Sequence, residues 1–267
     1  MESLSPTPKT PTPTSVPTVP ATYLPLTRTA TYSFLASLPL FLLYEVLITL
    51  ANRGQLSQVR ISAEVWTKRL LASLGGTGLL GLGIAVLAIG IVVFMMERKK
   101  KIPIRPRYLG WMLGESLVYA LVLGALVGTT VGAIFNMALS SAPLVSFPLQ
   151  AGPESLDPMM QLALSLGAGL YEELVFRVVL VGGMAWAFAG LFKNKTTAYI
   201  VAAVIGAAIF SGVHYIGSLG DVFTLPSFTF RFLFGLALNA LFLLRGFGIA
   251  AWTHALYDVS IVFGVWG

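Results

Sequence analysis

Runs of about twenty apolar residues are the feature that most limits how this chain can fold. They recur between residues 31 and 267, and at 1.5 Å per helical residue a run of that length spans the hydrocarbon core of a bilayer. Only 10% of the 267 residues are charged, and 56% are hydrophobic. A soluble domain carries about 25% charged residues, because its surface needs polar cover. The sequence therefore predicts an integral membrane protein.

The apolar runs divide into about seven predicted spans. These are Thr31–Ala51, Gly75–Met96, a segment within Leu109–Leu139, Ala168–Gly190, Thr196–Tyr215, Phe230–Leu244 and Gly248–Gly267. Asn52–Leu71 mixes apolar residues with Arg60, Lys68 and Arg69, a pattern typical of a helix that lies at the membrane surface. We therefore expect an all-α fold, a polytopic transmembrane helix bundle with about seven spans plus an interfacial helix.

The chain divides into three predicted parts. Residues 1–30 form a Pro/Thr-rich segment that is too poor in apolar residues to build a core, so we expect a disordered tail. Residues 31–157 should form N-terminal membrane helices, and residues 158–267 should form motif-bearing helices of the same membrane domain. Within the second group, Gly167 and Gly169 predict a break between a short lead-in helix and the fourth span.

The basic residues predict an orientation in the membrane. The net charge is +6, but the lysines and arginines lie in short clusters between apolar runs and form no basic and aromatic face, so we expect no nucleic-acid partner. The ends that hold Arg28, Arg98–Arg107 and Lys193–Lys195 should be cytoplasmic, although Arg53–Arg69 oppose this assignment. Charge counting then places the polar residues described next in the outer half of the membrane.

Ionisable residues within the apolar runs are the candidates for chemistry, because each costs roughly 2.5–3.5 kcal/mol to insert at the centre of a membrane helix. They are Glu45, Glu115, Glu172, Glu173, Arg177, Asp258 and both histidines of the chain, His214 and His254. Most of them lie in the last hundred residues. The chain has no cysteine, which excludes thiolate metal sites and a cysteine nucleophile.

Three short patterns organise these residues. In the first, Glu173 and Arg177 are four residues apart, so they share a helix face and can form an ion pair. Glu172 lies about 100° around the helix and lacks that partner, which makes it the better candidate for a general base. The alternative interpretation is that both glutamates only tie helices together.

The second pattern is the sequence Phe210-Ser211-Gly212-Val213-His214, at the end of a helix rich in small residues that allow close helix packing. The third places His254 and Asp258 four residues apart on one helix face. That spacing suits a pair of metal ligands or an imidazole oriented by a carboxylate. Taken alone, His214 at a helix end is more often a structural residue, and the His254–Asp258 pair could equally make a hydrogen bond between helices or form a site.

Taken together, EExxxR, FxxxH and HxxxD on successive membrane helices resemble the CAAX-protease and bacteriocin-processing family of intramembrane peptidases, which includes the type II CAAX prenyl endopeptidases. The resemblance covers residues 168–267. It implies that Glu172 activates water, that His214 assists it and that His254 is the second site histidine. Asp258 occupies a position often held by Asn in this family.

The resemblance implies proteolysis of either the metallo- or the glutamate type. A divalent metal such as zinc could be shared by Glu172, His214, His254 and Asp258. An ionised Asp258 cannot donate a hydrogen bond to an oxyanion as Asn could, so it favours a role as metal ligand or as the group that orients His254. Glu173 could contribute to the same orienting or metal-binding role.

The predicted function is hydrolysis of a peptide bond in a hydrophobic or lipidated membrane-associated substrate, by a protein of a bacterial plasma membrane surrounded by lipid. Two alternatives stay open: a non-catalytic membrane scaffold or immunity factor of the same fold and, as the weaker one, a proton-coupled transporter. Intramembrane Glu and His residues also build proton relays. The sequence has no inverted repeat of the kind that many transporters contain, and it leaves the oligomeric state open.

Overall fold

The computed structural model describes residues 22–53, 60–73, 78–136, 157–216 and 220–266. Residues 1–21, most of the predicted tail, and the end of the Leu109–Leu139 segment lie outside these ranges. Within the described residues every element is helical: α1 Tyr23–Thr27, α2 Ala30–Ala51, α3 Ser62–Ser73, α4 Gly78–Glu97, η1 Arg98–Lys100, α5 Pro106–Ile134, α6 Pro158–Gly167, η2 Ala168–Glu172, η3 Leu174–Val181, α7 Gly182–Phe188, α8 Lys195–Val213, α9 Leu225–Arg245 and α10 Phe247–Val262. The predicted all-α class is confirmed.

Local sequence explains where several of these helices begin. Thr29 caps α2 by accepting a hydrogen bond from the backbone N–H of Tyr32, and Thr224 caps α9 in the same way. The carboxylate of Glu97 accepts two further hydrogen bonds at the start of α2, from the N–H groups of Ala30 and Thr31. A negative charge at a helix N-terminus stabilises the helix, so the end of α4 fixes the start of α2.

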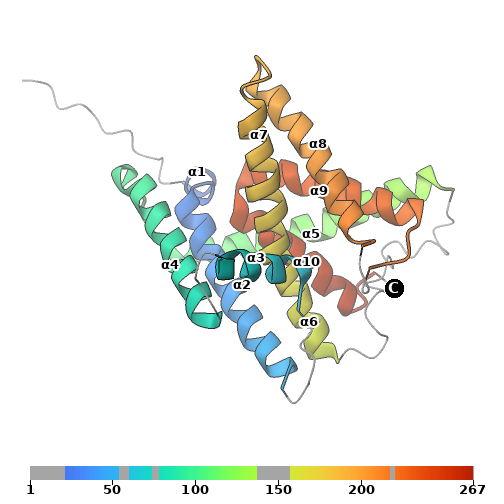
Figure 1. Ribbon diagram of the computed structural model, residues 1–267, viewed down its shortest axis with the longest axis horizontal. Coiled ribbons are helices and arrows are strands. Elements are labelled where there is room, and N and C mark those ends of the chain that lie inside the picture. Colours follow the sequence, from blue (N-terminus) through green and yellow to red (C-terminus); the bar gives the residue numbers. More distant parts are fainter. Residues whose placement is uncertain (1–21, 54–59, 74–77, 137–156, 217–219, 267) are drawn as a thin grey trace, which may run out of the picture.

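Helix α10 lies at the centre of the bundle, where it packs against α2, α5, α6, η2 and α9 (Figure 1). Several of its buried residues are small: Ala250, Ala251 and Ala255 are fully buried. Small side chains let helices approach closely in a membrane. The third motif, on this helix, is therefore surrounded by the other membrane helices.

The first motif lies on one continuous helical column that runs from Pro158 to Phe188 through α6, η2, η3 and α7 (Figure 1). The predicted break at Gly167 and Gly169 is wrong. Both ends of η2 keep right-handed helical dihedral angles, and the winding changes there from α to π. The glycines serve close packing instead, because a Cβ atom on Gly169 would lie 2.5 Å from the carbonyl oxygen of Ala251.

The count of about seven spans is not confirmed. Four of the described helices are long and apolar enough to cross a membrane: α2, α5, α8 and α9. Helix α10 has 16 residues, about 24 Å at 1.5 Å per residue, which is less than the roughly 30 Å of a bilayer core. The described part of the predicted interfacial segment is α3, which crosses the column and α2 in Figure 1; its placement at a membrane surface stays a prediction.

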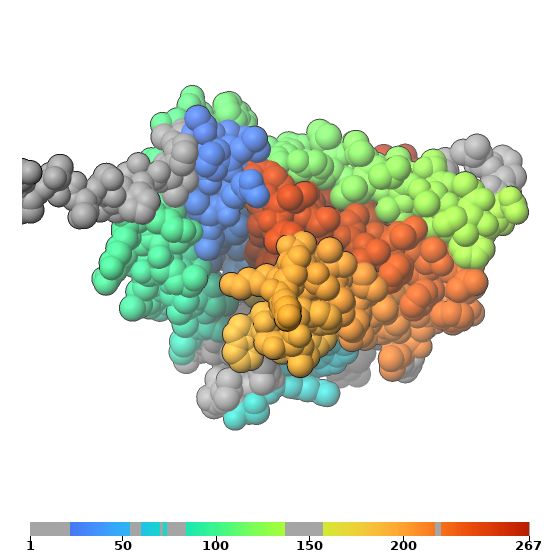
Figure 2. All heavy atoms as spheres, turned by 90° about the horizontal axis from the view of Figure 1, so that it is seen from above, coloured from blue at the N-terminus to red at the C-terminus, as the bar shows by residue number. Residues whose placement is uncertain are grey.

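A buried ion pair holds the corner between α9 and α10. Arg245, at the end of α9, donates hydrogen bonds to both carboxylate oxygens of Glu115 on α5, at 2.6 and 2.8 Å, and one to Thr27. Viewed from above, α1 and the start of α2 lie against this corner (Figure 2). Glu115 is thus an intramembrane acid with a structural partner.

Candidate active site

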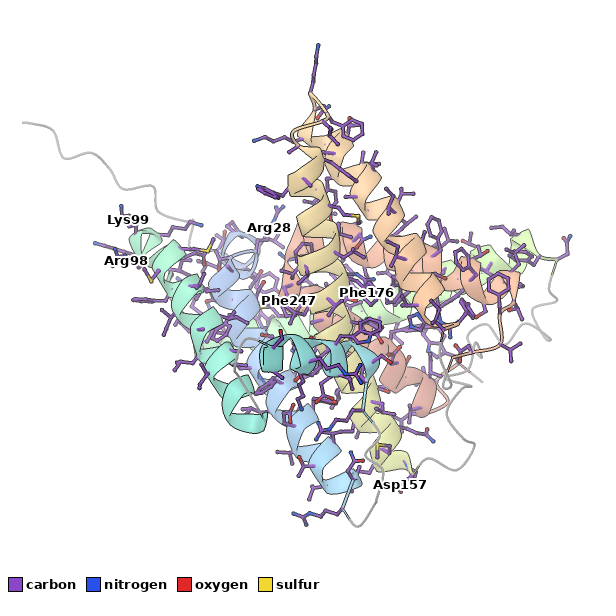
Figure 3. All side chains as sticks on the ribbon, viewed as in Figure 1. Arg28, Arg98, Lys99, Asp157, Phe176 and Phe247 are labelled. Carbon is purple, nitrogen blue, oxygen red and sulfur yellow. The ribbon has the colours of Figure 1, made fainter. Side chains whose placement is uncertain are left out.

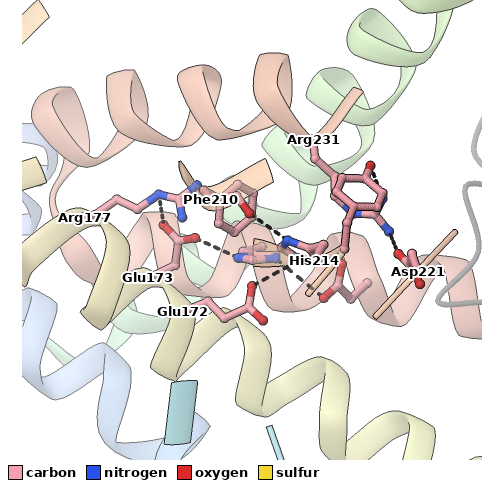
Figure 4. Close-up of polar contacts among 10 residues, drawn as sticks. Glu172, Glu173, Arg177, Phe210, His214, Asp221 and Arg231 are labelled. Carbon is pink, nitrogen blue, oxygen red and sulfur yellow. Dashed lines mark hydrogen bonds and ion pairs between the residues drawn. The ribbon is translucent and has the colours of Figure 1, made fainter. Parts of the chain in front are cut away.

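Three consecutive side chains of the column contact three different helices. Successive residues are about 100° apart around an α-helix, so adjacent side chains can face separate neighbours. The three contacts, to α2, α8 and α10 in turn, are Tyr171–Glu45, Glu172–His214 and Glu173–His254. Figure 4 shows the Glu172–His214 contact. Tyr171 and Glu172 belong to the π-helical turn η2, and Glu173 directly follows it. Such π-helical turns are frequent at functional sites.

Glu173 is fully buried and contacts two basic groups. Its Oε1 accepts a hydrogen bond of 2.7 Å from Nδ1 of His254, and its Oε2 lies 3.0 Å from Nε of Arg177, the contact that the spacing of four predicts. The Arg177 guanidinium also lies over the ring of Phe210, 4.3 Å from its centroid, as in a cation–π contact. Within the described residues the Arg177 nitrogens have no hydrogen-bond partner. The positive charge of Arg177 is therefore stabilised by the ion pair with Glu173 and by the ring of Phe210.

Glu172 and His214 form the more accessible part of the site. The side chains are 17% and 25% exposed, and 3.9 Å separate Oε2 of the glutamate from Nε2 of the histidine. Nδ1 of His214 lies 2.7 Å from the backbone oxygen of Phe210. A carbonyl oxygen only accepts, so Nδ1 carries the proton and donates it, and Nε2 is left to accept. The 3.9 Å gap is too long for a direct hydrogen bond but lets one water contact both groups.

His254 has a carboxylate near each ring nitrogen. Nδ1 contacts Glu173, and Nε2 lies 3.6 Å from Oδ2 of Asp258 on the same helix. Only the imidazolium form carries an N–H toward each of the two carboxylates. The rings of Phe210 and Phe234 stand edge-on to the imidazole, with centroids 5.9 and 6.1 Å away. His254 is therefore a buried group that can hold positive charge beside the exposed pair.

The four proposed metal ligands form two pairs in this arrangement. Glu172 lies beside His214, and Asp258 lies beside His254. Across the described residues, no three Asp, Glu or His side chains converge closely enough to hold a metal ion. The donor set therefore does not fit a shared divalent metal as it stands. The metal stays a prediction from the sequence.

Arg231 lies beside His214 (Figure 4), a position that the sequence analysis missed. It is the second residue of the predicted span Phe230–Leu244, for which the motifs indicated no functional role, and it lies within α9. It pairs with Asp221 and donates a hydrogen bond of 2.9 Å to the hydroxyl of Tyr215. The signal that could have identified it is its position seven residues into a helix that begins at Leu225, deep enough to face the end of α8.

A second polar cluster anchors the opposite side of the motif helix. The hydroxyl of Tyr171 donates to Glu45 at 3.1 Å, and its ring packs edge-on against Tyr44. Tyr44 in turn donates to Glu64 on α3, which also pairs with Lys68. The sequence marked Glu45 as an intramembrane acid, but pairing it with Tyr171 needs the packing of α2 against the column.

Comparison with known families supports the resemblance to intramembrane peptidases that the three motifs predict. Residues 154–260 match the type II CAAX prenyl endopeptidase Rce1-like family. Searches of the curated proteins and of the solved structures gave no match. The matched segment contains all three motifs and ends two residues after Asp258, and together with the apolar helices it marks the chain as a membrane protein related to proteases. The resemblance that the motifs predict is therefore confirmed: residues 154–260 of the chain are similar to the type II CAAX prenyl endopeptidase Rce1-like family.

Proposed function

We propose that the protein is an intramembrane endopeptidase that hydrolyses a peptide bond in a hydrophobic or lipidated substrate associated with a bacterial plasma membrane. One observation carries the proposal. Glu172 and His214 come from separate membrane helices, face each other across 3.9 Å and are the two most exposed members of the polar cluster, followed by Asp258. Ionisable side chains within apolar helices mark functional sites by default, and this pair has the geometry to hold a water.

In the proposed reaction, a water lies between the Glu172 carboxylate and Nε2 of His214. Glu172 takes one proton from the water while the water oxygen attacks the carbonyl carbon of the scissile bond. The negative charge that develops on the carbonyl oxygen is stabilised by the positive charge of the His254 imidazolium. Glu172 then delivers its proton to the amide nitrogen, the C–N bond breaks, and the products are a carboxylate and an amine.

The remaining polar groups hold this arrangement. Glu173 fixes the ring of His254 through Nδ1 at 2.7 Å, and the Arg177 guanidinium balances the Glu173 charge. Asp258 accepts only, so in this scheme it supports the imidazolium and donates nothing to the oxyanion. A bound divalent metal would supply a Lewis acid and lower the pKa of the attacking water; Glu172, His214, His254 and Asp258 would have to move to hold it.

One observation favours the non-catalytic alternative: Asp258 occupies a position at which the family often has Asn. A scaffold of the same fold would keep the Glu173–Arg177 and Glu173–His254 contacts and cleave nothing. The transporter alternative has no comparable observation in its favour.

Substitution of Glu172 separates these functions. Membranes from cells that express the wild type or Glu172→Gln are compared by mass spectrometry of enriched peptide termini. We expect new termini in membrane proteins only with the wild type, because loss of a general base lowers rates by about 10²–10⁴-fold. His214→Ala and His254→Ala should behave like Glu172→Gln. Identical termini in wild type and Glu172→Gln would leave the scaffold as the explanation.

Glu45→Gln is the matched control, because it changes another intramembrane glutamate while Tyr171 keeps a hydrogen-bond acceptor. It should retain the wild-type termini. The same assay on purified protein with a chelator tests the metal. We expect activity to persist, since the described donors do not converge on one ion. Near-stoichiometric zinc with reversible inactivation by the chelator would overturn the metal-free mechanism.

A further inference from the structure

Arg231 connects α9 to the His214 end of α8. From α9, its Nη1 donates hydrogen bonds to the hydroxyls of Tyr215 and Ser227, and its Nη2 pairs with the carboxylate of Asp221. Tyr215 also donates to Ser227 at 2.8 Å. We call these four side chains, Arg231, Tyr215, Ser227 and Asp221, the Arg231 cluster; all of them follow His214 in the sequence.

The cluster is attached to His214 through the backbone. The N–H of Asp221 donates a hydrogen bond of 2.8 Å to the backbone oxygen of His214, so the carboxylate held by Arg231 belongs to a residue that is itself bound to the histidine. Tyr215 is the next residue along the chain from His214. Arg231 thus holds the connection between α8 and α9 at two points, at Tyr215 near the end of α8 and at Asp221 nearer the start of α9.

The His214 turn needs such a restraint. Helix α8 ends at Val213, and His214 is its C-cap, where the last carbonyl groups of a helix lack intrahelical partners. The ring has one hydrogen bond within its own helix, from Nδ1 to the backbone oxygen of Phe210. Without contacts from another helix, the last turn could fray, and the distance between His214 and Glu172 would vary.

We propose that Arg231 is a positioning residue, which holds the end of α8 so that Nε2 of His214 stays opposite Glu172. The proposal rests on the proposed function and extends it to a residue outside the three motifs. The guanidinium of Arg231 is bound by Asp221, Tyr215 and Ser227 of its own chain, and its charge also lies over the Tyr215 ring, 5.4 Å from the centroid. An arginine bound in this way acts as a brace rather than as a receptor for a substrate carboxylate.

Only two histidines are present in the chain, which gives a direct readout of the restraint. Protein labelled with ¹³C and ¹⁵N in histidine and reconstituted in nanodiscs should give two sets of imidazole signals, assigned with His214→Gln and His254→Gln. We expect Arg231→Met to shift or broaden the His214 signals while the His254 signals stay near their wild-type positions. Asp221→Asn, which keeps the shape and loses the charge, should shift the same signals by less.

Matched lysine substitutions on α9 provide the control. Arg231→Lys keeps a charge for Asp221 but loses the planar fork that also reaches the two hydroxyls, so it should recover part of the wild-type His214 signal. Arg245→Lys makes the same change in the buried pair at the far end of the same helix and should leave both histidines unchanged. Native-like thermal unfolding of each variant in detergent shows that the comparison is between folded proteins.

Kinetics on purified protein complete the test. In Arg231→Met we expect kcat to fall about a hundredfold, the cost of a displacement of about 1 Å at a reacting group, with KM within about threefold of wild type and partial rescue by Arg231→Lys. Unchanged His214 signals in both Arg231→Met and Asp221→Asn would overturn the inference. If the wild type cleaves nothing while Arg231→Met still moves the His214 signals, the brace stands and the proposed function fails.

Discussion

Glu172 and Glu173 are neighbours in sequence and occupy different environments. Glu173 is fully buried between Arg177 and His254, whereas Glu172 is 17% exposed and has only His214 within 4 Å among the described basic groups. A carboxylate held by two basic groups is constrained in position and charge. A carboxylate with a free approach can bind and release a proton. The proposed division into a structural and a catalytic glutamate follows from these contacts.

Removal of Arg177 should therefore affect stability more than removal of Glu172. Arg177→Ala leaves the buried Glu173 with His254 as its remaining partner, and breaking a buried pair costs about 3–5 kcal/mol. Glu172→Ala removes a partly exposed side chain, for which we expect about 1 kcal/mol. Thermal unfolding of the purified variants in detergent measures the difference. Equal unfolding midpoints for Arg177→Ala and wild type would show that the pair contributes no stability.

Single residues also show how far the sequence could be interpreted. Helical spacing of four predicts the Glu173–Arg177 contact and the proximity of His254 to Asp258, because helix geometry is local. The Glu173–His254 hydrogen bond joins residues 81 positions apart, and the sequence does not contain the packing of α10 against the column. Arg231 was missed for the same reason: its role depends on how the end of α8 meets α9.

The motif helix is the element on which the site depends. The sequence predicts a helix there and, from two glycines, a break. The structure keeps the helix and changes its winding to π over Ala168–Glu172 and Leu174–Val181. Glycine signals in a sequence do not distinguish a break from a close approach of two helices. Here the close approach is the explanation, because a Cβ on Gly169 would meet the backbone of α10 at 2.5 and 2.6 Å.

Gly169→Ala should therefore be strongly destabilising. The added methyl would push α10 from the column, and overpacking costs typically 1–3 kcal/mol; contact with backbone atoms places this variant near about 3 kcal/mol. Gly183→Ala is the matched control in α7, since a Cβ there meets nothing within 4 Å and Ala favours a helix. The free energies of unfolding of both variants are compared in detergent. A Gly169→Ala protein as stable as Gly183→Ala would contradict the packing argument.

At the scale of the whole molecule, the N-terminal helices are part of the support for the site. The family match begins at residue 154, yet Glu45 of α2 binds Tyr171, and α5 packs against α10. The sequence predicted that residues 31–157 and 158–267 form one membrane domain, and these contacts are those such a domain needs. It could not predict which N-terminal residues face the motif helix, because apolar runs of similar composition differ little in periodicity.

The distribution of charged residues along the chain predicts an orientation for the whole molecule. Arg28, Arg98 and Lys99 lie toward one end and Asp157 lies at the other (Figure 3). The positive-inside rule assigns the first end to the cytoplasm. The predicted span Ala168–Gly190 would put Glu172 in its first turns, but the helical column begins at Pro158 and places Glu172 near its middle. The depth of the site therefore no longer favours an outward opening.

Cysteine labelling can determine the orientation directly, because the chain has no cysteine of its own. Lys99→Cys and Asp157→Cys place one thiol at each end, both at exposed positions. We expect an impermeant maleimide to label Asp157→Cys on intact cells and to label Lys99→Cys only after the membrane is opened, since the basic end should face the cytoplasm. Equal expression of the two variants and equal labelling in detergent serve as controls. The reverse pattern would place the basic end outside, against the charge rule, and would give residues 53–69, whose basic residues oppose the assignment, the greater weight.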